Sequence, residues 1–179
     1  MKTERVPGRE CGGCIACCRV LPIDTPELRK VPGILCEHCG TSGCTIYETR
    51  FPICRTYFCG WHTLAMLDED WRPDKSGIIV SPRKEDIPAG YQAEGIEFLV
   101  FGGERAIRRK PFAPALAAFI GSNVATYLAI SGPPGYFPAG VLLNEVIGSS
   151  LERGDIDAAR DLLVKIYRSA ARHTFAKME

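Results

Sequence analysis

Residues 11–18 have the sequence CGGCIACC, and a second cysteine pair follows in CEHC at 36–39. All nine cysteines of this 179-residue chain fall between positions 11 and 59. Two cysteines separated by two residues can turn both sulfurs toward one ion, and Gly12 and Gly13 permit the tight turn that this requires. The spacing therefore predicts a metal-binding region whose thiolate ligands are Cys11, Cys14, Cys17, Cys18, Cys36, Cys39, Cys44, Cys54 and Cys59.

A disulfide framework is the first alternative for thiols at this density. The N-terminal sequence MKTERVPGRE is charged and lacks the apolar segment of a secretory signal, so we expect a cytoplasmic protein. Disulfides rarely persist in that compartment, and an odd number of cysteines cannot pair completely within one chain. Free thiols packed as small apolar groups would explain one or two buried cysteines, but not CxxC pairs. Metal ligation is the favoured interpretation.

Composition limits the classes of partner. Hydrophobic residues make up 46% of the chain, which is enough for an ordinary core. Basic and acidic side chains number 22 and 21, and this balance argues against a strong nucleic-acid footprint. The most apolar stretch, 111–130, is interrupted by Pro114 and by Gly121-Ser122-Asn123, so we expect no membrane span. The expected partner is a metal ion, and a protein partner stays open.

The pattern after the cysteines predicts an α+β fold. We expect residues 1–62 to form the cysteine-rich metal-binding module and residues 63–179 to pack against it in one compact domain. Segments 96–101 and 104–109 flank Gly102-Gly103, which predicts a β-hairpin. With a strand at 78–81, this hairpin would give a small antiparallel sheet.

Helices are predicted for most of the C-terminal part. Asp24 or Thr25 followed by Pro26 also predicts a short helix that ends near residues 32–33. A further helix is expected over 141–151, and Asp155 should cap the last one. One apolar face in the 111–130 region is formed by Leu116, Phe119, Ile120, Val124, Tyr127 and Leu128, and the face of the last helix by Ile156, Ala159, Leu163, Ile166 and Ala170.

Several features of the metal chemistry stay open. Two tetrahedral zinc sites would use eight thiolates, whereas one [4Fe–4S] cluster would use four, so zinc is the first expectation and iron or [4Fe–4S] the alternative. His38 and His62 could each supply a nitrogen ligand, although the cysteines on both sides of His38 are the better ligands and a histidine beside a tryptophan, as His62 is, is more often a packed or surface side chain. Because a zinc ion with four thiolates carries about −2, we predict that Arg19 and Arg55 help to neutralise the sulfurs.

Two further patterns can be read together. They are Cys11-x2-Cys14-x2-Cys17-Cys18 and the stretch Gly43-Cys44-Thr45-Ile46-Tyr47-Glu48-x-Arg50-x-Pro52-x-Cys54-Arg55. With this combination the chain resembles the CxxCxxCC family, whose domain is described as chelating zinc or iron. The resemblance covers roughly residues 11–60, and Phe51 splits the Arg-Pro pair that is usual in the family. The resemblance implies metal binding through Cys11, Cys14, Cys17, Cys18, Cys44 and Cys54.

Three functions are compatible with these observations. The first is a metal-binding protein, for zinc or iron, whose thiolate sites are structural or serve metal handling. The second is an iron–sulfur enzyme of redox or methyl-transfer chemistry, because a flagellin lysine N-methylase carries a similar cysteine cluster. The third is a zinc-stabilised module for binding protein or RNA. No catalytic pattern is found after residue 62, so whether the chain is an enzyme stays open.

Overall fold

The computed structural model describes residues 4–172 and 175–179. Its centre is a four-stranded sheet in the order β5-β6-β7-β8, in which β6 and β7 run parallel and the two outer pairs are antiparallel. The predicted α+β class and the strand at 78–81 are confirmed, but the expected purely antiparallel sheet is wrong. The strands are β5 (Ile78–Arg83), β6 (Gly95–Val100), β7 (Thr126–Ile130) and β8 (Ala139–Leu142).

The hairpin predicted across Gly102-Gly103 is absent. Instead, the carbonyl of Gly77 accepts the N–H groups of Phe101 and Gly102, both at 2.9 Å, and a Cβ on Gly102 would lie 2.8 Å from the Gly77 Cα. Gly103 then adopts a φ of 71° and precedes helix α5 (Glu104–Ile107). The two glycines therefore permit a close backbone approach and begin the helical crossover that a parallel β6–β7 pair requires.

The apolar stretch at 111–130 divides between a helix and a strand. Helix α6 (Phe112–Gly121) ends before Asn123, which has a φ of 57°, and the chain continues as β7. All five residues of β7 are buried, because both faces of the sheet are covered. A continuous apolar run does not distinguish a buried strand from a helix, and this is why the predicted helix extended too far.

The last two predicted helices are present. They are α7 (Asn144–Glu152) and α8 (Ile156–Ala170), and the Asp155 carboxylate accepts the Ala158 N–H at 3.0 Å. The predicted apolar face of α8 packs against the core, with Ala159, Leu163 and Ala170 fully buried. In the described part of the chain, every helix is too short or too polar to cross a bilayer.

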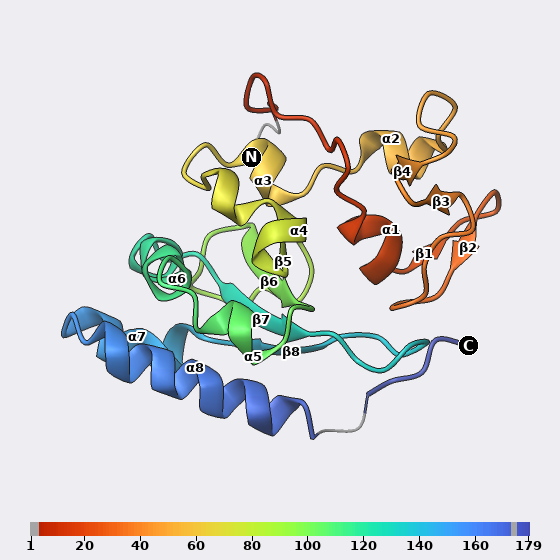
Figure 1. Cartoon of the computed structure of the whole chain (residues 1–179). Helices are drawn as coiled ribbons and strands as arrows, with labels where there is room; N and C mark the ends of the chain where they lie inside the picture. The colour runs from red at the N-terminus through yellow and green to blue at the C-terminus, as the bar shows by residue number, and fades with distance from the viewer. Residues whose placement is uncertain (1–3, 173–174) are drawn as a thin grey trace.

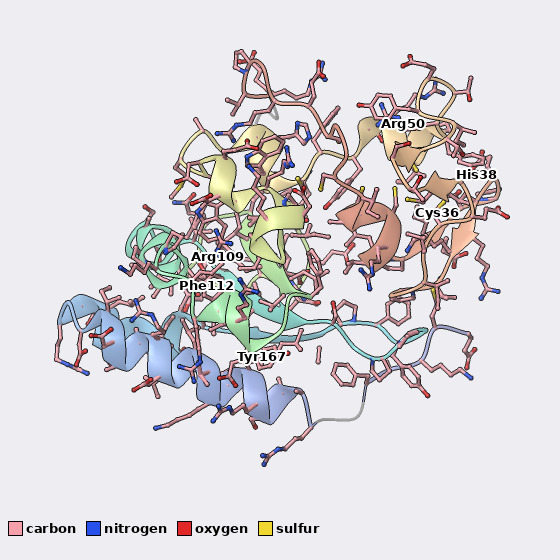
Figure 2. All side chains as sticks on the ribbon, viewed as in Figure 1. Cys36, His38, Arg50, Arg109, Phe112 and Tyr167 are labelled. Carbon is pink, nitrogen blue, oxygen red and sulfur yellow. The ribbon has the colours of Figure 1, made fainter. Side chains whose placement is uncertain are left out.

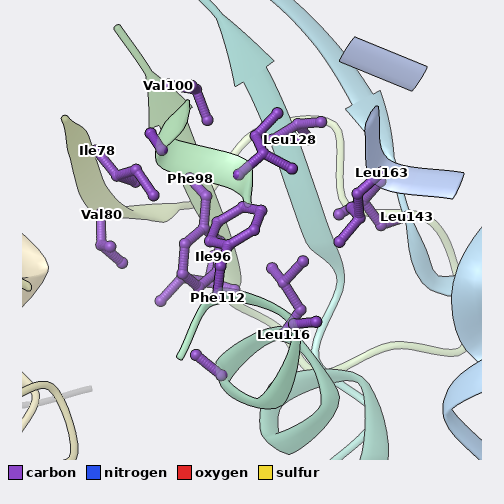
Figure 3. Close-up of a cluster of buried hydrophobic side chains, with 14 of the residues drawn as sticks. Ile78, Val80, Ile96, Phe98, Val100, Phe112, Leu116, Leu128, Leu143 and Leu163 are labelled. Atoms are coloured by element: carbon purple, nitrogen blue, oxygen red, sulfur yellow. The ribbon is translucent and has the colours of Figure 1, made fainter. Parts of the chain in front are cut away.

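The two faces of the sheet are covered by different parts of the chain. On one face, Phe98 stacks edge-on with Phe112 of α6 at 5.8 Å between ring centroids, in the main core that includes residues of α5 to α8 (Figure 3). On the other face, Ile79, Leu99 and Ala129 contact the N-terminal region. Figure 1 accordingly shows α7 and α8 at one side of the sheet and the cysteine-rich region at the other.

The N-terminal region consists of short elements. Its first helix, α1 (Ala16–Val20), packs Ala16 and Val20 against the sheet. The predicted helix near residues 24–32 is wrong, because Thr25 closes a turn with Leu28 instead, and β1 (Ile23–Asp24) pairs with β2 (Arg29–Lys30). The following elements are β3 (Cys39–Gly40), β4 (Gly43–Cys44), α2 (Pro52–Thr56), α3 (Gly60–Thr63), η1 (Glu69–Trp71) and α4 (Pro73–Ser76).

Candidate metal centre

Both CxxC segments form tight turns. The N–H of Cys14 donates to the Cys11 carbonyl and that of Cys39 to the Cys36 carbonyl, each at 2.9 Å. The first turn uses Gly12 with a φ of 51°, as expected from its sequence. A further bond of 2.9 Å, from the Cys36 N–H to the Cys18 carbonyl, holds the second CxxC turn against α1. Sulfur atoms accordingly gather between α1 and the β3–β4 hairpin, near the labelled Cys36 (Figure 2).

One set of sulfurs surrounds this turn. Cys39 and Cys44 are opposite each other in the β3–β4 ladder. Burial raises the pKa of Cys39, and the nearby sulfurs of Cys18, Cys36 and Cys44 raise it further. The same three sulfurs act on Cys54, whose pKa is raised first by burial. We call this set the α1–β4 group, and it consists of Cys18, Cys36, Cys39, Cys44 and Cys54.

A second set lies next to helix α3. Burial raises the pKa of Cys59 to about 11, and the sulfurs of Cys11 and Cys14 raise it in the same direction. The Sγ of Cys11 lies 3.3 Å from Nε2 of the buried His62. We call Cys11, Cys14 and Cys59 the α3 group. It adjoins the α1–β4 group, because the nearby Cys18 sulfur contributes to raising the pKa of Cys11.

Cys17 lies beside the α1–β4 group. A side-chain hydrogen bond between Cys17 and Cys18, followed by burial, raises the pKa of Cys18 strongly.

All nine thiols therefore lie in one region. All nine are among the described residues, and none forms a disulfide.

Lys30 and Arg50 are two of the cations that act on these sulfurs, and Arg72 acts on Cys14. Lys30 is only 5% exposed, and burial lowers its pKa while Cys36, Cys18 and Cys17 act in the opposite direction. Its Nζ donates to the carbonyls of Leu21 and Val31, and in the described part of the chain it forms no ion pair with a carboxylate.

Burial raises the pKa of both Cys11 and Cys54, and the charge of Arg50 opposes that rise, so Arg50 acts on a sulfur of each group. Its guanidinium stacks over the Tyr47 ring at 3.6 Å and donates to the Tyr47 carbonyl at 2.8 Å. Arg19 and Arg55, which were predicted to neutralise the sulfurs, are both exposed. Their role in neutralising the sulfurs stays a prediction.

The two candidate histidines differ in their surroundings. His38 lies within a CxxC turn, but its side chain is 32% exposed, with Nε2 at 3.6 Å from a Glu37 carboxylate oxygen. Its ring contacts Phe51. His62 is buried and faces a sulfur. Of these two histidines, His62 is the one positioned as a nitrogen donor.

The arrangement is not a closed coordination sphere. Within residues 4–172 and 175–179, no three ligating side chains surround a common point closely enough to hold an ion as they stand. The fit to a metal therefore rests on the donor types, their grouping and the buried cation beside them. None of the protein families, curated proteins or solved structures compared with this chain matches it.

Proposed function

We propose that this chain binds zinc or iron through the thiolates of its N-terminal region, in a structural or metal-handling role. Support comes from the grouping of nine thiols with no disulfide among them. Burial raises the pKa of Cys11, Cys14, Cys39, Cys54 and Cys59, and a hydrogen bond with Cys17 together with burial raises that of Cys18, so the metal-free protein keeps these six thiols protonated. A divalent cation would remove this barrier, because it favours the thiolate form and releases the protons to solvent.

The buried ammonium of Lys30 is the observation that carries the proposal. A buried charge is costly unless an opposite charge lies near it. The acidic groups that face Lys30 are the thiols of Cys17, Cys18 and Cys36. If these were only small apolar groups, the ammonium would have no counter-charge, whereas a zinc–thiolate site with a net charge of about −2 supplies one.

Elemental analysis of freshly purified protein tests the proposal, combined with absorption spectroscopy under anaerobic conditions. Zinc protein should be colourless, whereas an iron–sulfur protein should be brown and absorb near about 400 nm. Brown protein would favour the iron–sulfur enzyme as the function. Protein without zinc or iron, which also takes up neither ion when its thiols are reduced, would overturn the proposal.

A further inference from the structure

Two chain segments far apart in sequence meet at His62. The turn at residues 11–14 places Cys11 Sγ at 3.3 Å from His62 Nε2, although the two residues are 51 positions apart. The His62 N–H donates to the Cys59 carbonyl at 2.9 Å, so Cys59 and His62 belong to one turn. The His62 carbonyl in turn accepts the Val6 N–H at 2.7 Å. Backbone bonds thus fix this histidine beside the α3 group.

The ring of His62 has the properties of a ligand. It is 4% exposed and packs edge-on against the rings of Phe58 and Trp61. Buried imidazoles normally hydrogen-bond through both nitrogens, but Nδ1 has no partner in the described structure. Burial, followed by the charges of Arg5 and Arg9, lowers its pKa. The buried ring, with one nitrogen beside a sulfur and the other without a partner among the described residues, is therefore available as a nitrogen donor.

Asp74 is the competing fourth donor, because its carboxylate also interacts with Cys14. Both of its oxygens, however, are already bonded to the Arg72 guanidinium, at 2.7 and 2.8 Å. Withdrawing the carboxylate would break a bidentate ion pair, whereas His62 loses nothing comparable by turning to a metal. The imidazole is the better donor.

We propose that Cys11, Cys14, Cys59 and His62 form a metal site of three sulfurs and one nitrogen, separate from an all-sulfur site in the α1–β4 group. This inference rests on the proposed function. A donor set of three cysteines and one histidine is typical of structural zinc, so zinc is the ion that we assign to it. Binding requires the side chains to rotate inward, and each coordinating thiol loses its proton to solvent.

X-ray absorption of the zinc-loaded, tag-free chain tests the ligand assignment. The chain has three histidines, so the double variant His38→Phe/His173→Phe leaves His62 as the only imidazole. We expect this variant to keep the imidazole scattering of the wild type, with nitrogen at roughly 2.0–2.1 Å and sulfur at about 2.3 Å. Scattering from sulfur alone, in the wild type or in this double variant, would overturn the assignment. The test does not require a change at the buried His62.

Two matched cysteine variants test the separation of the sites. Cys59→Ser should abolish the imidazole scattering and remove about one ion per chain. Cys54→Ser should keep that scattering and affect only the ion with sulfur ligands. Loss of the imidazole scattering in both variants would show a single shared site and refute the separation while leaving the proposed function intact. A wild-type chain that binds no zinc at all would instead refute the proposed function.

Discussion

Replacing Lys30 by methionine should weaken metal binding. Methionine keeps an unbranched side chain of similar length at this buried position but removes the charge beside Cys17, Cys18 and Cys36. The variant also loses the bonds from Nζ to two carbonyls. Those bonds are lost with and without metal, so they largely cancel in the affinity, which is a difference between the two states.

The magnitude follows from the charge of the metal site. If the separation is taken as roughly 10 Å, a net charge of about −2 attracts an ammonium by about 1 kcal/mol in water and by about 3 kcal/mol at an effective dielectric constant of 20. This range agrees with the effect of removing a group that supports metal ligands, which is about 10- to 100-fold in affinity. We therefore expect Lys30→Met to lower zinc affinity by about 10- to 100-fold.

Competition with a chromophoric chelator at fixed ionic strength measures this change. Arg29→Met is the matched control, because Arg29 directly precedes Lys30 in β2 but is exposed. Its Nε lies 3.9 Å from Oδ1 of Asp24, so its charge faces a carboxylate. We expect the control to change affinity by less than about 3-fold, since exposed charges contribute little. Equal effects in the two variants, or unchanged affinity in Lys30→Met, would refute the argument that the buried ammonium stabilises the thiolates.

Three further outcomes test the fold and its stability. Removing metal with a chelator should reduce the protection of backbone amides from hydrogen exchange in residues 11–62. Strands β5 to β8 should stay protected, because the main core contains few cysteines. Equal protection with and without metal would count against a structural role of the metal. Phe98→Ala should lower the free energy of unfolding in urea by about 3–5 kcal/mol, since the ring is fully buried; a loss below about 1 kcal/mol would contradict this packing. Bonds from Arg168 and then Arg108 lower the pKa of Glu104 from 4.5, so its carboxylate stabilises the fold above that pH and the contribution is lost as pH falls through the lowered pKa. Glu104→Gln should therefore show a smaller drop in melting temperature between about pH 6 and pH 3, and identical pH profiles would exclude this contribution.

Three short-range signals in the sequence predicted their own structures correctly, whereas the one at residues 24–26 did not. The Asp155 cap, the apolar face of α8 and the strand at 78–81 depend on residue types within a few positions of one another. The same kind of reasoning failed at Gly102-Gly103 and at residues 124–130. Gly102 and Gly103 do not form a hairpin turn, because Gly102 is needed for close contact with the distant Gly77. Strand β7 was mistaken for helix, because it is covered on both faces and is therefore uniformly apolar.

The candidate site also combines features that the sequence predicted with features that only the fold decided. The cysteine spacing predicted which thiols are candidate ligands, and the first CxxC turn formed where Gly12 predicted it. Lys30 could not be distinguished from Arg29 in the sequence, because only the pairing of β2 decides which of two successive side chains is buried. His62 stayed one of two candidates until the fold placed Cys11 against its ring.

The sequence by itself determined that nine thiols would be crowded into the first third of the chain and that an α+β fold would follow. These properties depend on composition and on local spacing. The tertiary structure alone decided the order of the strands, the division of the sulfurs into neighbouring groups, and the identity of the buried cation beside them. Such contacts join residues that are far apart in the sequence, and they form only when the chain folds over the two faces of one sheet.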